Sequence, residues 1–368
     1  MMYDVLFLTD EHMGCSNGNK LVFEEQMRFY EQQLFPYILQ NNISHVVSLG
    51  DITDKREYID LYILQELKQR MFGWFEKNKV NIKYLLGNHS CYHKNTTSHN
   101  FFVENFNEYK YCTYIDTPTT FYIGKYTFYA IPWVTGKLSE VELKPADICL
   151  THSDMKGMRF TKGIDSKAGF DVDSFAQYHY VLNGHMHIQS RHKNVINIGN
   201  PYQKDFGDFL EPKGFFVLKD NFELEFVENI LSPKHIKIFY SEKNGLTIQG
   251  DEPERKISDK EAVELNKSNY CKIIILDSKS QKKFDKFHES MVSCSKNNYK
   301  VEVIEASEIL ESVDMTKLEE NVNSDSNELE IINAYSQELE LNDIDPIKLN
   351  ECFETLYKEV LLSEKEGE

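Results

Sequence analysis

The chain has 368 residues, of which 41% are hydrophobic and 27% are charged, a composition typical of folded globular proteins and a length that predicts two domains or one large domain with an appendage. Its apolar runs stop far short of the roughly 20 residues that a bilayer-spanning helix needs, and its first residues lack the basic segment of a signal peptide, so we expect neither a membrane-bound nor a secreted protein. The formal net charge of −18 lies almost entirely in residues 301–368, which hold 20 Asp and Glu against 4 Lys and Arg, so the near-neutral remainder does not exclude a phosphate-bearing partner.

The first part of the chain alternates between buried strands and amphipathic helices. Short apolar runs without a helical period predict strands over residues 3–9, 46–49 and 82–86. Between them, apolar residues at three- and four-residue spacing predict helices over 23–40 and 58–78. This alternation indicates a layered α/β domain.

The rest of that domain is richer in strands, and a smaller unit follows it. Further strands are predicted over residues 120–122, 126–131, 148–150, 180–182, 195–198 and 214–218. The pattern changes near residues 231–235, after which strands at 235–240, 271–276 and 299–304 and a helix at 281–294 form a compact α+β module. We therefore expect domains at 1–230 and 231–310, followed by an acidic linker and helical segment at 311–368.

The acidic C-terminal part contains one predicted helix. Asp345 and Pro346 supply an N-cap followed by proline at the first helical position. Its apolar stripe consists of Leu349, Cys352, Phe353, Leu356, Val360 and Leu361. The stripe either folds back as local core or meets another chain, whereas the acidic residues around it are more typical of a solvated, partly disordered segment than of a docking element.

The cysteines predict a reducing compartment. The chain has seven of them, at positions 15, 91, 112, 149, 271, 294 and 352, with no CxxC pair and no regular spacing. An odd number leaves at least one unpaired. We therefore expect a cytoplasmic protein.

Five short segments place Asp, Asn or His just after a predicted strand. They are Asp10-Glu11-His12, Gly50-Asp51, Gly87-Asn88-His89, His152 and Gly184-His185-Met186-His187. In open α/β sheets, the loops at the carboxyl ends of the strands converge on one crevice. We therefore expect these five segments to meet in space.

The converging residues have the composition of a metal site. Two carboxylates, one amide oxygen and four imidazoles are available: Asp10, Asp51, Asn88, His12, His152, His185 and His187. Seven ligands are too many for one tetrahedral ion, but a bridging carboxylate, which we assign to Asp51, divides them into two sets of four. Nitrogen and oxygen donors favour manganese, iron or zinc, and softness does not separate manganese from iron. Two such ions about 3.5–4 Å apart can clamp a phosphodiester and activate water, so the set predicts hydrolysis of a phosphate ester.

His89 is left over from the ligand set. Because it follows Asn88 directly, it could stabilise developing charge or protonate the leaving oxygen, a role typically worth roughly 100- to 10,000-fold in rate. The glycines Gly50, Gly87 and Gly184 would allow the close backbone approach that such loops need.

Each of these motifs also has a purely structural interpretation. Any one of the five segments alone is more often a cap or a turn, and only their combination at strand ends favours a metal site. Five other histidines are predicted at the surface or at strand edges, namely His45, His179, His192, His235 and His288. His93 and His99 stand in the polar loop 91–100, which we interpret as an ordinary loop and not as a substrate contact.

The order of the motifs resembles the calcineurin-like metallophosphoesterase superfamily and, within it, the SbcD or Mre-eleven family of DNA-repair nucleases, including its phage members. The resemblance covers roughly residues 1–230. It rests on TDEHMG at 9–14, GDITD at 50–54, GNH at 87–89, PTT at 118–120, IPW at 131–133, NGHMH at 183–187 and IGNP at 198–201.

The resemblance implies a four-layer α/β/β/α sandwich with a small α+β capping domain and a C-terminal helical tail. It implies that one metal is held by Asp10, His12, Asp51 and His187, and the other by Asp51, Asn88, His152 and His185. His89 would be the histidine that stabilises the transition state. Manganese is the usual activator of the family.

The resemblance also implies a double-strand 3'-to-5' exonuclease and single-strand endonuclease that acts on DNA in double-strand-break repair and recombination. Residues 235–305 would be the DNA-capping domain. The stripe from Leu349 to Leu361 would bind an SMC-like ATPase of the SbcC or Rad-fifty type. Two copies of this chain would form a homodimer within a heterotetramer. The complex would be located in the cytoplasm, or in the host cytoplasm for a phage protein.

Two residues depart from the family pattern. Ser90 replaces the Asp that commonly follows Gly-Asn-His, which puts the orientation of His89 in question. Asp54 stands where some cellular members have a second histidine, which puts their exonuclease chemistry in question. Two other functions therefore compete: a small-molecule or protein phosphoesterase on the same scaffold, and a weakly active subunit that regulates the ATPase.

Overall fold

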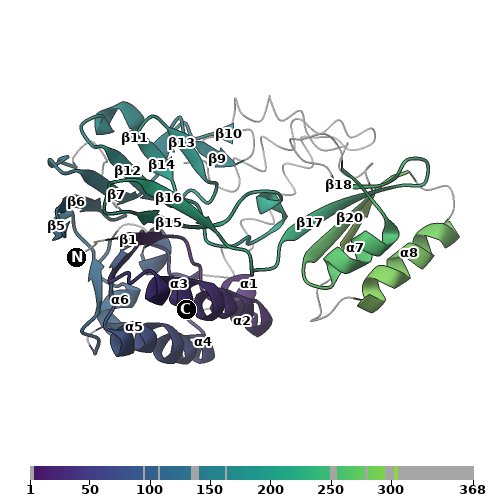
Figure 1. Cartoon of the computed structure of the whole chain (residues 1–368), viewed down its shortest axis with the longest axis horizontal. Coiled ribbons are helices and arrows are strands. Elements are labelled where there is room, and N and C mark those ends of the chain that lie inside the picture. The colour runs from purple at the N-terminus through teal and green to yellow at the C-terminus, as the bar shows by residue number, and fades with distance from the viewer. Residues whose placement is uncertain are drawn as a thin grey trace, which may run out of the picture.

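The computed structural model of the chain describes residues 4–93, 96–106, 108–133, 141–161, 164–248, 255–277, 281–294 and 302–305. The predicted C-terminal helix with its apolar stripe and the start of the strand predicted at 299–304 lie outside these residues. Two six-stranded sheets pack face to face, and a five-stranded sheet follows them in the chain (Figure 1).

The first sheet has the order β16-β15-β1-β2-β3-β4. Its parallel strands are β1 (Val5–Leu8), β2 (His45–Ser48), β3 (Asn81–Leu85) and β4 (Cys112–Ile115). The antiparallel strands β15 (Gly214–Leu218) and β16 (Leu224–Glu228) extend the other edge. The sequence predicted the strands at β1, β2, β3 and β15 but neither β4 nor β16, whose residues are partly exposed and lack a long apolar run.

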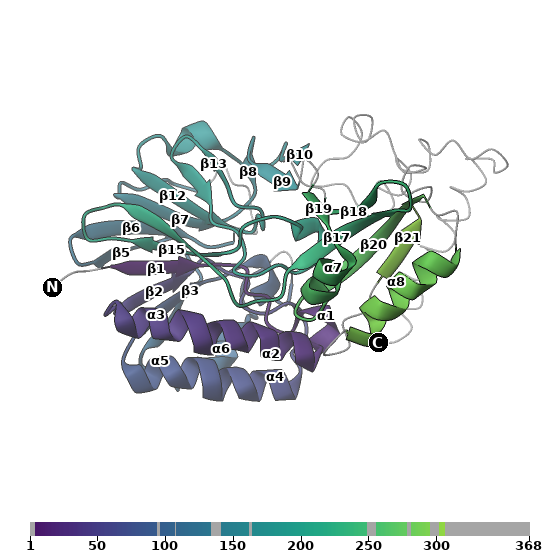
Figure 2. The same cartoon turned by 45° about the vertical axis from the view of Figure 1, so that its right-hand side comes forward.

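Two long helices cover the outer face of the first sheet (Figure 2). The first comprises α2 (Lys20–Phe29), a π-helical turn (Tyr30–Leu34) and α3 (Phe35–Gln40), and the second comprises α4 (Leu61–Glu66), a π-helical turn (Leu67–Phe72) and α5 (Gly73–Asn78). Both were predicted, the second with a start three residues too early. Asp60 is the N-cap of α4, because its carboxylate accepts hydrogen bonds from the backbone N–H groups of Tyr62 and Ile63.

The second sheet has the order β13-β14-β12-β7-β6-β5. Its strands are β5 (Thr119–Ile123), β6 (Tyr126–Ile131), β7 (Ile148–His152), β12 (Tyr180–Gly184), β13 (Ser190–His192) and β14 (Val195–Asn197). The inner strands are parallel, and the two edge strands are antiparallel to their neighbours. All of them except β13 were predicted.

A buried apolar layer joins the two sheets. Phe7 and Val47 reach it from the first sheet, and Phe128, Leu150 and Leu182 reach it from the second. The ring of Phe128 lies 6.2 Å from that of Phe7, centre to centre. The mixed α/β fold predicted for the chain is therefore confirmed, with two sheets packed through side chains that alternate along each strand.

The outer face of the second sheet differs in detail from the fourth, helical layer that was expected. Within the described residues it is covered by the short strands β8 (Met155–Lys156), β9 (Arg159–Thr161), β10 (Ile164–Asp165) and β11 (Phe170–Asp171) and a 3-10 turn at Val172–Phe175. Gly157 and Gly169 have φ of 81° and 99°, which interrupts any helix. Met155, Phe175 and Tyr178 cover the apolar face in place of a helix.

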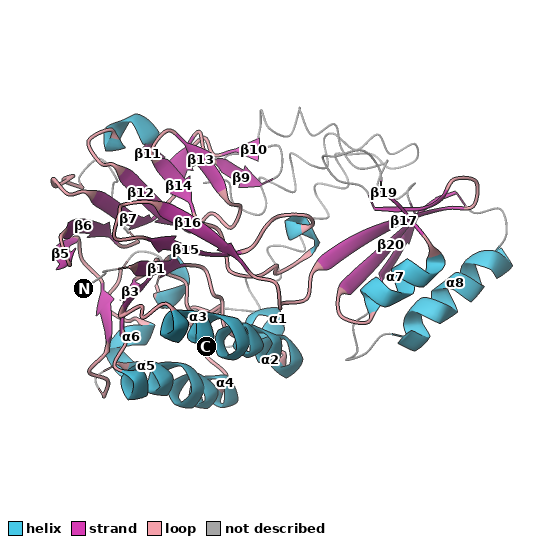
Figure 3. Ribbon diagram, in the orientation of Figure 1, coloured by secondary structure: helices cyan, strands magenta, loops and turns pink. Residues whose placement is uncertain are grey.

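Residues 235–305 form a separate α+β unit (Figure 3). Its sheet has the order β19-β18-β17-β20-β21. The strands are β17 (His235–Ser241), β18 (Gly245–Ile248), β19 (Arg255–Ile257), β20 (Tyr270–Asp277) and β21 (Glu302–Glu305), with helices α7 (Asp259–Asn266) and α8 (Gln281–Cys294). Ile238, Ile273 and Met291 belong to a core of its own. The sequence did not predict β18, β19 or α7, because each is too short to show a clear period.

No helix among the described residues is long and apolar enough to cross a membrane. The cysteines in this part of the chain are all free, and only Cys294 is appreciably exposed.

We predict that Phe128→Ala destabilises the sandwich, because Phe128 is fully buried, stacks on Phe121 at 5.2 Å and contacts the opposite sheet. Removing a buried phenylalanine side chain typically costs about 3–5 kcal/mol, which thermal and denaturant unfolding would measure. Tyr122→Ala, on the neighbouring strand and 72% exposed, is the control and should change the stability little. Equal effects of the two substitutions would contradict the packing described.

Candidate metal centre

The five predicted segments meet at the carboxyl ends of the strands. β1, β2 and β3 of the first sheet and β7 and β12 of the second all end at this edge, and the loops after β1 and β2 run side by side. The backbone N–H of Asp10 donates to the Gly50 carbonyl at 2.9 Å, and that of His12 donates to the Asp51 carbonyl at 2.9 Å. The structure thus brings together all seven predicted ligands and His89.

Asp10 is fully buried, and its two carboxylate oxygens have different surroundings. Oδ2 accepts hydrogen bonds from Thr9 Oγ1 at 2.8 Å and from the His185 backbone N–H at 2.9 Å. Oδ1 is buried without a hydrogen-bond partner, 3.8 Å from His12 Nε2 and 3.7 Å from His187 Nε2. These two Nε2 atoms are 3.1 Å apart. Three ligand atoms therefore face one position, and a cation there would satisfy them all.

A second group of ligand atoms surrounds the amide of Asn88. Its Oδ1 lies 3.0 Å from His152 Nε2 and 3.0 Å from His185 Nδ1. Asp51 Oδ2 lies 3.2 Å from the same His152 Nε2. On the other side of the ring, His152 Nδ1 donates to the Leu49 carbonyl at 2.8 Å, which leaves Nε2 with its lone pair toward the group.

The Asn88 amide can face the His152 and His185 rings with either its oxygen or its nitrogen. With the oxygen toward His152 and His185, the Asn88 amide nitrogen lies 3.1 Å from Arg56 Nη2. Half a turn of the amide would point its N–H groups at both rings and let its oxygen accept from Arg56. A cation held by Asn88 requires the first orientation, whereas a hydrogen-bond network of the side chains alone favours the second.

Asp51 lies between the two groups. Its Oδ2 is 3.2 Å from His152 Nε2 and 3.9 Å from His12 Nε2, whereas its Oδ1 accepts from the His89 backbone N–H at 2.7 Å. Asp51 thus belongs to two groups of possible ligands, one with His152 and His185 and the other with His12 and His89. A third group, formed by Asp10, His12 and His187, lies next to them.

The buried carboxylates attract positive charge strongly. Burial alone would raise the pKa of Asp51, but the charge of His152, its hydrogen bond and the charge of His12 lower that pKa well below its usual range. Burial would likewise lower the pKa of His152, yet the charge of Asp51 raises it to about 9. A cation bound between them would take the place of this proton, because a ligating imidazole must be neutral.

Two further carboxylates orient the imidazole rings of the ligands. The sequence did not predict this role for either of them. Asp54 Oδ1 lies 3.4 Å from His12 Nδ1, and Asp154 Oδ1 lies 3.4 Å from His185 Nε2. In each case the contact is made to the ring nitrogen that faces away from the ligand group. Such carboxylate–histidine contacts fix the ring and raise its basicity as a ligand. Asp54, noted from the sequence only as a departure, therefore supports His12.

Asp54 also positions His89. His89 Nδ1 lies 2.5 Å from the Asp54 carbonyl oxygen, and its ring packs edge-on against His12 at 4.8 Å between centres. The Ser90 hydroxyl is buried and has no hydrogen-bond partner among the described residues. The backbone of Asp54, and not residue 90, thus holds His89 in place.

Four of the proposed ligands have left-handed backbone conformations. The φ angles are 53° at Asp10, 41° at His12, 55° at Asp51 and 71° at His185. Such conformations cost of order 1–3 kcal/mol each and persist where the surroundings determine them, frequently at functional sites. They turn the chain sharply after each strand and aim the side chains back at the shared position.

The neighbouring glycines are needed for close approach. A Cβ atom at Gly87 would lie 2.2 Å from Asp51 Oδ1, and one at Gly184 would lie 2.3 Å from Thr9 Oγ1. At Gly50, where φ is +122°, it would lie 2.4 Å from His152 Nδ1. The absence of a side chain at these positions lets the loops pack around the ligands.

A buried ion pair supports the loop of His187. Lys213 Nζ donates to Asp208 Oδ1 at 2.7 Å and to the His187 carbonyl at 2.9 Å, and it also contacts Asn200 Oδ1. Both partners of the pair are less than a tenth exposed. Although burial would raise the pKa of Asp208, the charge and hydrogen bond of Lys213 lower it, so the carboxylate is ionised at neutral pH.

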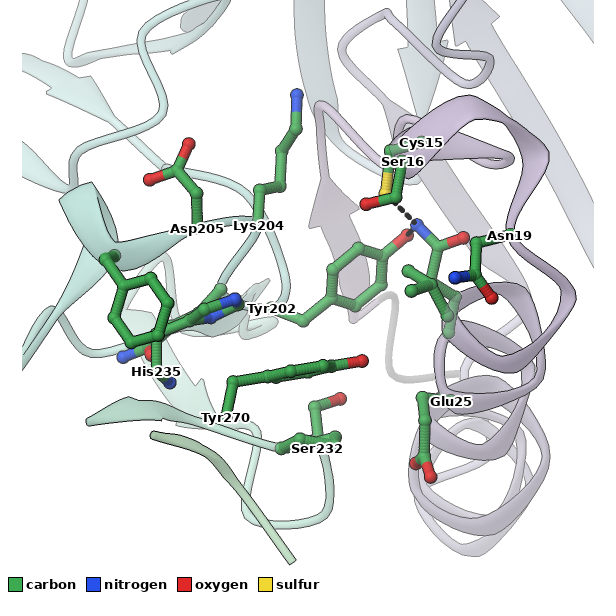
Figure 4. Close-up of a pocket in the computed structure, with 15 residues that line it drawn as sticks. Cys15, Ser16, Asn19, Glu25, Tyr202, Lys204, Asp205, Ser232, His235 and Tyr270 are labelled. Atoms are coloured by element: carbon green, nitrogen blue, oxygen red, sulfur yellow. Dashed lines mark hydrogen bonds between the residues drawn. The ribbon is translucent and has the colours of Figure 1, made fainter. Parts of the chain in front are cut away.

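A cavity of about 350 Å³ lies beside the ligand pocket, between the start of α2 and the first strand of the α+β unit (Figure 4). Lys204 lines it and reaches to 3.9 Å from Asp54 Oδ1. His235, predicted at the surface or a strand edge, begins β17 but is buried, and its ring stacks on Tyr270 at 4.7 Å. Its burial follows from this contact with another strand, which the local sequence does not reveal.

Fold and site together define a metal-dependent phosphoesterase. The sequence model of the calcineurin-like phosphoesterase family matches residues 3–189, just over half of the chain, and the chain belongs to this family. It is 28% identical over 231 residues to exonuclease subunit 1 of Enterobacteria phage T4, covering 61% of this chain and 67% of that protein. Among solved structures, it is similar to GAP50, the anchor in the inner membrane complex of Plasmodium, with a TM-score of 0.36 and 11% identity over 82% of this chain and 96% of that chain. A likeness at that TM-score supports no conclusion about function.

We predict that Lys213→Met destabilises the protein, because it leaves the Asp208 carboxylate buried without its partner. Breaking a buried ion pair in this way typically costs about 3–5 kcal/mol, which thermal unfolding at neutral pH would detect. The double variant Lys213→Met with Asp208→Leu removes both charges and should recover much of the loss. A double variant no more stable than Lys213→Met alone would contradict this assignment.

Proposed function

We propose that the chain is the nuclease subunit of a DNA repair and recombination complex and hydrolyses phosphodiesters with two divalent cations. The observation that carries the proposal is the position of Asp51 Oδ2, between a group with His12 and a group with His152. The similarity to an exonuclease subunit of phage T4 over 231 residues supports DNA as the substrate.

The ligand atoms divide into two sets that share Asp51. Asp10, His12, Asp51 and His187 would hold one cation, and Asp51, Asn88, His152 and His185 would hold the other. The oxygen and imidazole nitrogen donors suit manganese, iron or zinc, and we propose manganese because it is the usual activator of the family that the sequence resembles. Bound there, the two cations would polarise the phosphoryl group and lower the pKa of a water molecule.

His89 has the position for work on the phosphate. It is not needed as a ligand in either set, yet one of its ring nitrogens lies within 4.8 Å of ligand atoms of His12 and Asp51. Because Nδ1 donates to the Asp54 carbonyl, Nε2 is the atom left to face the substrate. We infer that it stabilises charge on the phosphate or protonates the leaving oxygen.

We propose the activity and the assembly that are known for the SbcD or Mre-eleven family, which the sequence resembles. We infer a double-strand 3'-to-5' exonuclease and single-strand endonuclease, with the α+β unit at residues 231–310 capping the DNA. The partner would be an SMC-like ATPase of the SbcC or Rad-fifty type, bound through residues 349–361 by a homodimer of this chain. The free cysteines fit a cytoplasmic setting.

We predict that the purified protein cleaves labelled duplex and single-stranded DNA when manganese is added, and that His89→Ala lowers turnover by roughly 100- to 10,000-fold. Manganese binding, measured by calorimetry, should persist in this variant because His89 belongs to neither ligand set. Ser90→Ala is the matched control and should leave turnover nearly unchanged, since the Ser90 hydroxyl makes no hydrogen bond. Cleavage of a nitrophenyl phosphodiester but not of DNA would favour a small-molecule phosphoesterase instead.

We predict that Asp51→Asn removes both manganese-binding events seen by calorimetry, because Asp51 belongs to both ligand sets. His185→Ala should remove one event and leave the other, since its Nδ1 faces only the group around Asn88. If the two variants lost the same number of ions, Asp51 would not be the shared ligand.

A further inference from the structure

A second cavity, which we call the Arg56 cavity, opens next to the metal centre. It has a volume of about 230 Å³ and is lined by, among others, Lys55, Arg56, Tyr58, His89, Tyr92 and His99. His89 belongs both to this cavity and to the metal centre, so whatever occupies the cavity lies beside the reacting phosphate. None of the proposed functions described above uses Arg56.

One nitrogen of Arg56 offers a hydrogen bond that no group in the described part of the chain accepts. Its Nη1 is buried and has no partner, and none of the ion pairs found among the described residues includes it. The carboxylate nearest in the chain, Glu57, also lines the cavity, but it is exposed and forms no ion pair with Arg56 within the described part of the structure. A buried donor without an acceptor is costly, and more so when it is charged.

The metal centre removes an acceptor that Arg56 Nη2 could reach. The Asn88 amide lies 3.1 Å from Arg56 Nη2, and its oxygen could accept from Arg56 only by turning away from His152 and His185. When that oxygen holds a cation, the amide presents its N–H groups to Arg56. Two donors then face each other, and an anion is the species that both can bind.

The walls of the cavity suit a nucleotide whose base is not paired. Tyr58 is 66% exposed and Tyr92 is 48% exposed, and both line the cavity with His99. Exposed aromatic rings next to cationic groups are how proteins bind single strands, because every base has a face that can stack. The volume lies below the roughly 300–1,000 Å³ of pockets that enclose whole small ligands, and therefore fits one unit of a longer chain.

We propose that the Arg56 cavity binds the nucleotide next to the scissile phosphate of a single-stranded nucleic acid, with its phosphate on Arg56 and its base stacked on Tyr58. This inference rests on the proposed nuclease function and adds the strand subsite to it. It also revises the interpretation of residues 91–100 as an ordinary loop, since Tyr92 and His99 would contact the substrate.

The test is the binding of a fluorescent single-stranded phosphorothioate oligonucleotide, which resists cleavage, measured by anisotropy in manganese at several salt concentrations. Arg56→Gln should weaken binding at least about tenfold and reduce the slope of log K against log salt by about 0.7, the value for one contact to a single-strand phosphate. Arg56→Lys keeps the charge and should keep most of the slope.

Lys125→Gln is the matched control. Lys125 is exposed and lies in the turn before β6, at the sheet edge opposite the metal centre, so removing its charge should leave affinity and slope unchanged. Tyr58→Ala, at an exposed position, should weaken binding about 5- to 100-fold by loss of stacking without changing the slope, and it tests the cavity if Arg56→Gln does not fold.

An unchanged slope in a folded Arg56→Gln protein would overturn the inference. The inference would also be overturned if Arg56→Gln lost manganese binding but kept the slope of log K against log salt. Arg56 would then only hold Asn88 in position. An unchanged affinity of Tyr58→Ala would overturn it if Arg56→Gln did not fold. If the wild-type protein hydrolysed no phosphodiester in manganese, the proposed function itself would fail, which is a different result from an active enzyme whose Arg56 variant binds normally.

Discussion

Two carboxylates, Asp10 and Asp51, lie buried at the edge where the two sheets of the sandwich meet. Burying an anion is unfavourable unless positive charge compensates it. In this protein the compensating groups are the imidazoles of His12, His152 and His187, which come from three segments of the chain, and their nitrogen atoms face the carboxylate oxygens at 3.2–3.9 Å. Bound cations would complete the compensation, and the positions of the surrounding side chains follow from this requirement.

The fold satisfies the requirement by ending its parallel strands at one edge. The loops after β1 and β2 are tied together by backbone hydrogen bonds, and left-handed conformations at Asp10, His12 and Asp51 turn the side chains inward. The buried ion pair between Lys213 and Asp208 supports a third loop, because Lys213 Nζ also donates to the His187 carbonyl. The backbone of these loops thus determines where the ligand side chains lie.

Much of this arrangement could be predicted from the sequence. Strands such as those ending at Leu8 and Ser48 show uninterrupted apolar runs, and the ligands stand directly after them, so their convergence follows from the rule for parallel sheets. The contacts that orient the ligands could not be predicted in the same way. Asp54 and Asp154 act on rings from distant segments, and nothing in their local sequence distinguishes them from surface carboxylates.

The segments that cover the outer face of the second sheet and the residues of the Arg56 cavity could not be predicted from the sequence either. A helical layer was expected over the second sheet, but among the described residues the short strands β8 to β11 and a 3-10 turn cover it, with Met155, Phe175 and Tyr178 packed on its apolar face. Arg56 gains its meaning from the Asn88 amide 32 positions further along the chain. Interactions that depend on tertiary proximity alone leave no periodic pattern in the sequence.

Anomalous diffraction at the manganese edge, from crystals grown with manganese, would locate the bound cations. We predict two peaks roughly 3.5–4 Å apart, one beside Asp10 and His187, the other beside Asn88 and His185, and both within bonding distance of Asp51. A single peak, or peaks away from Asp51, would contradict this prediction.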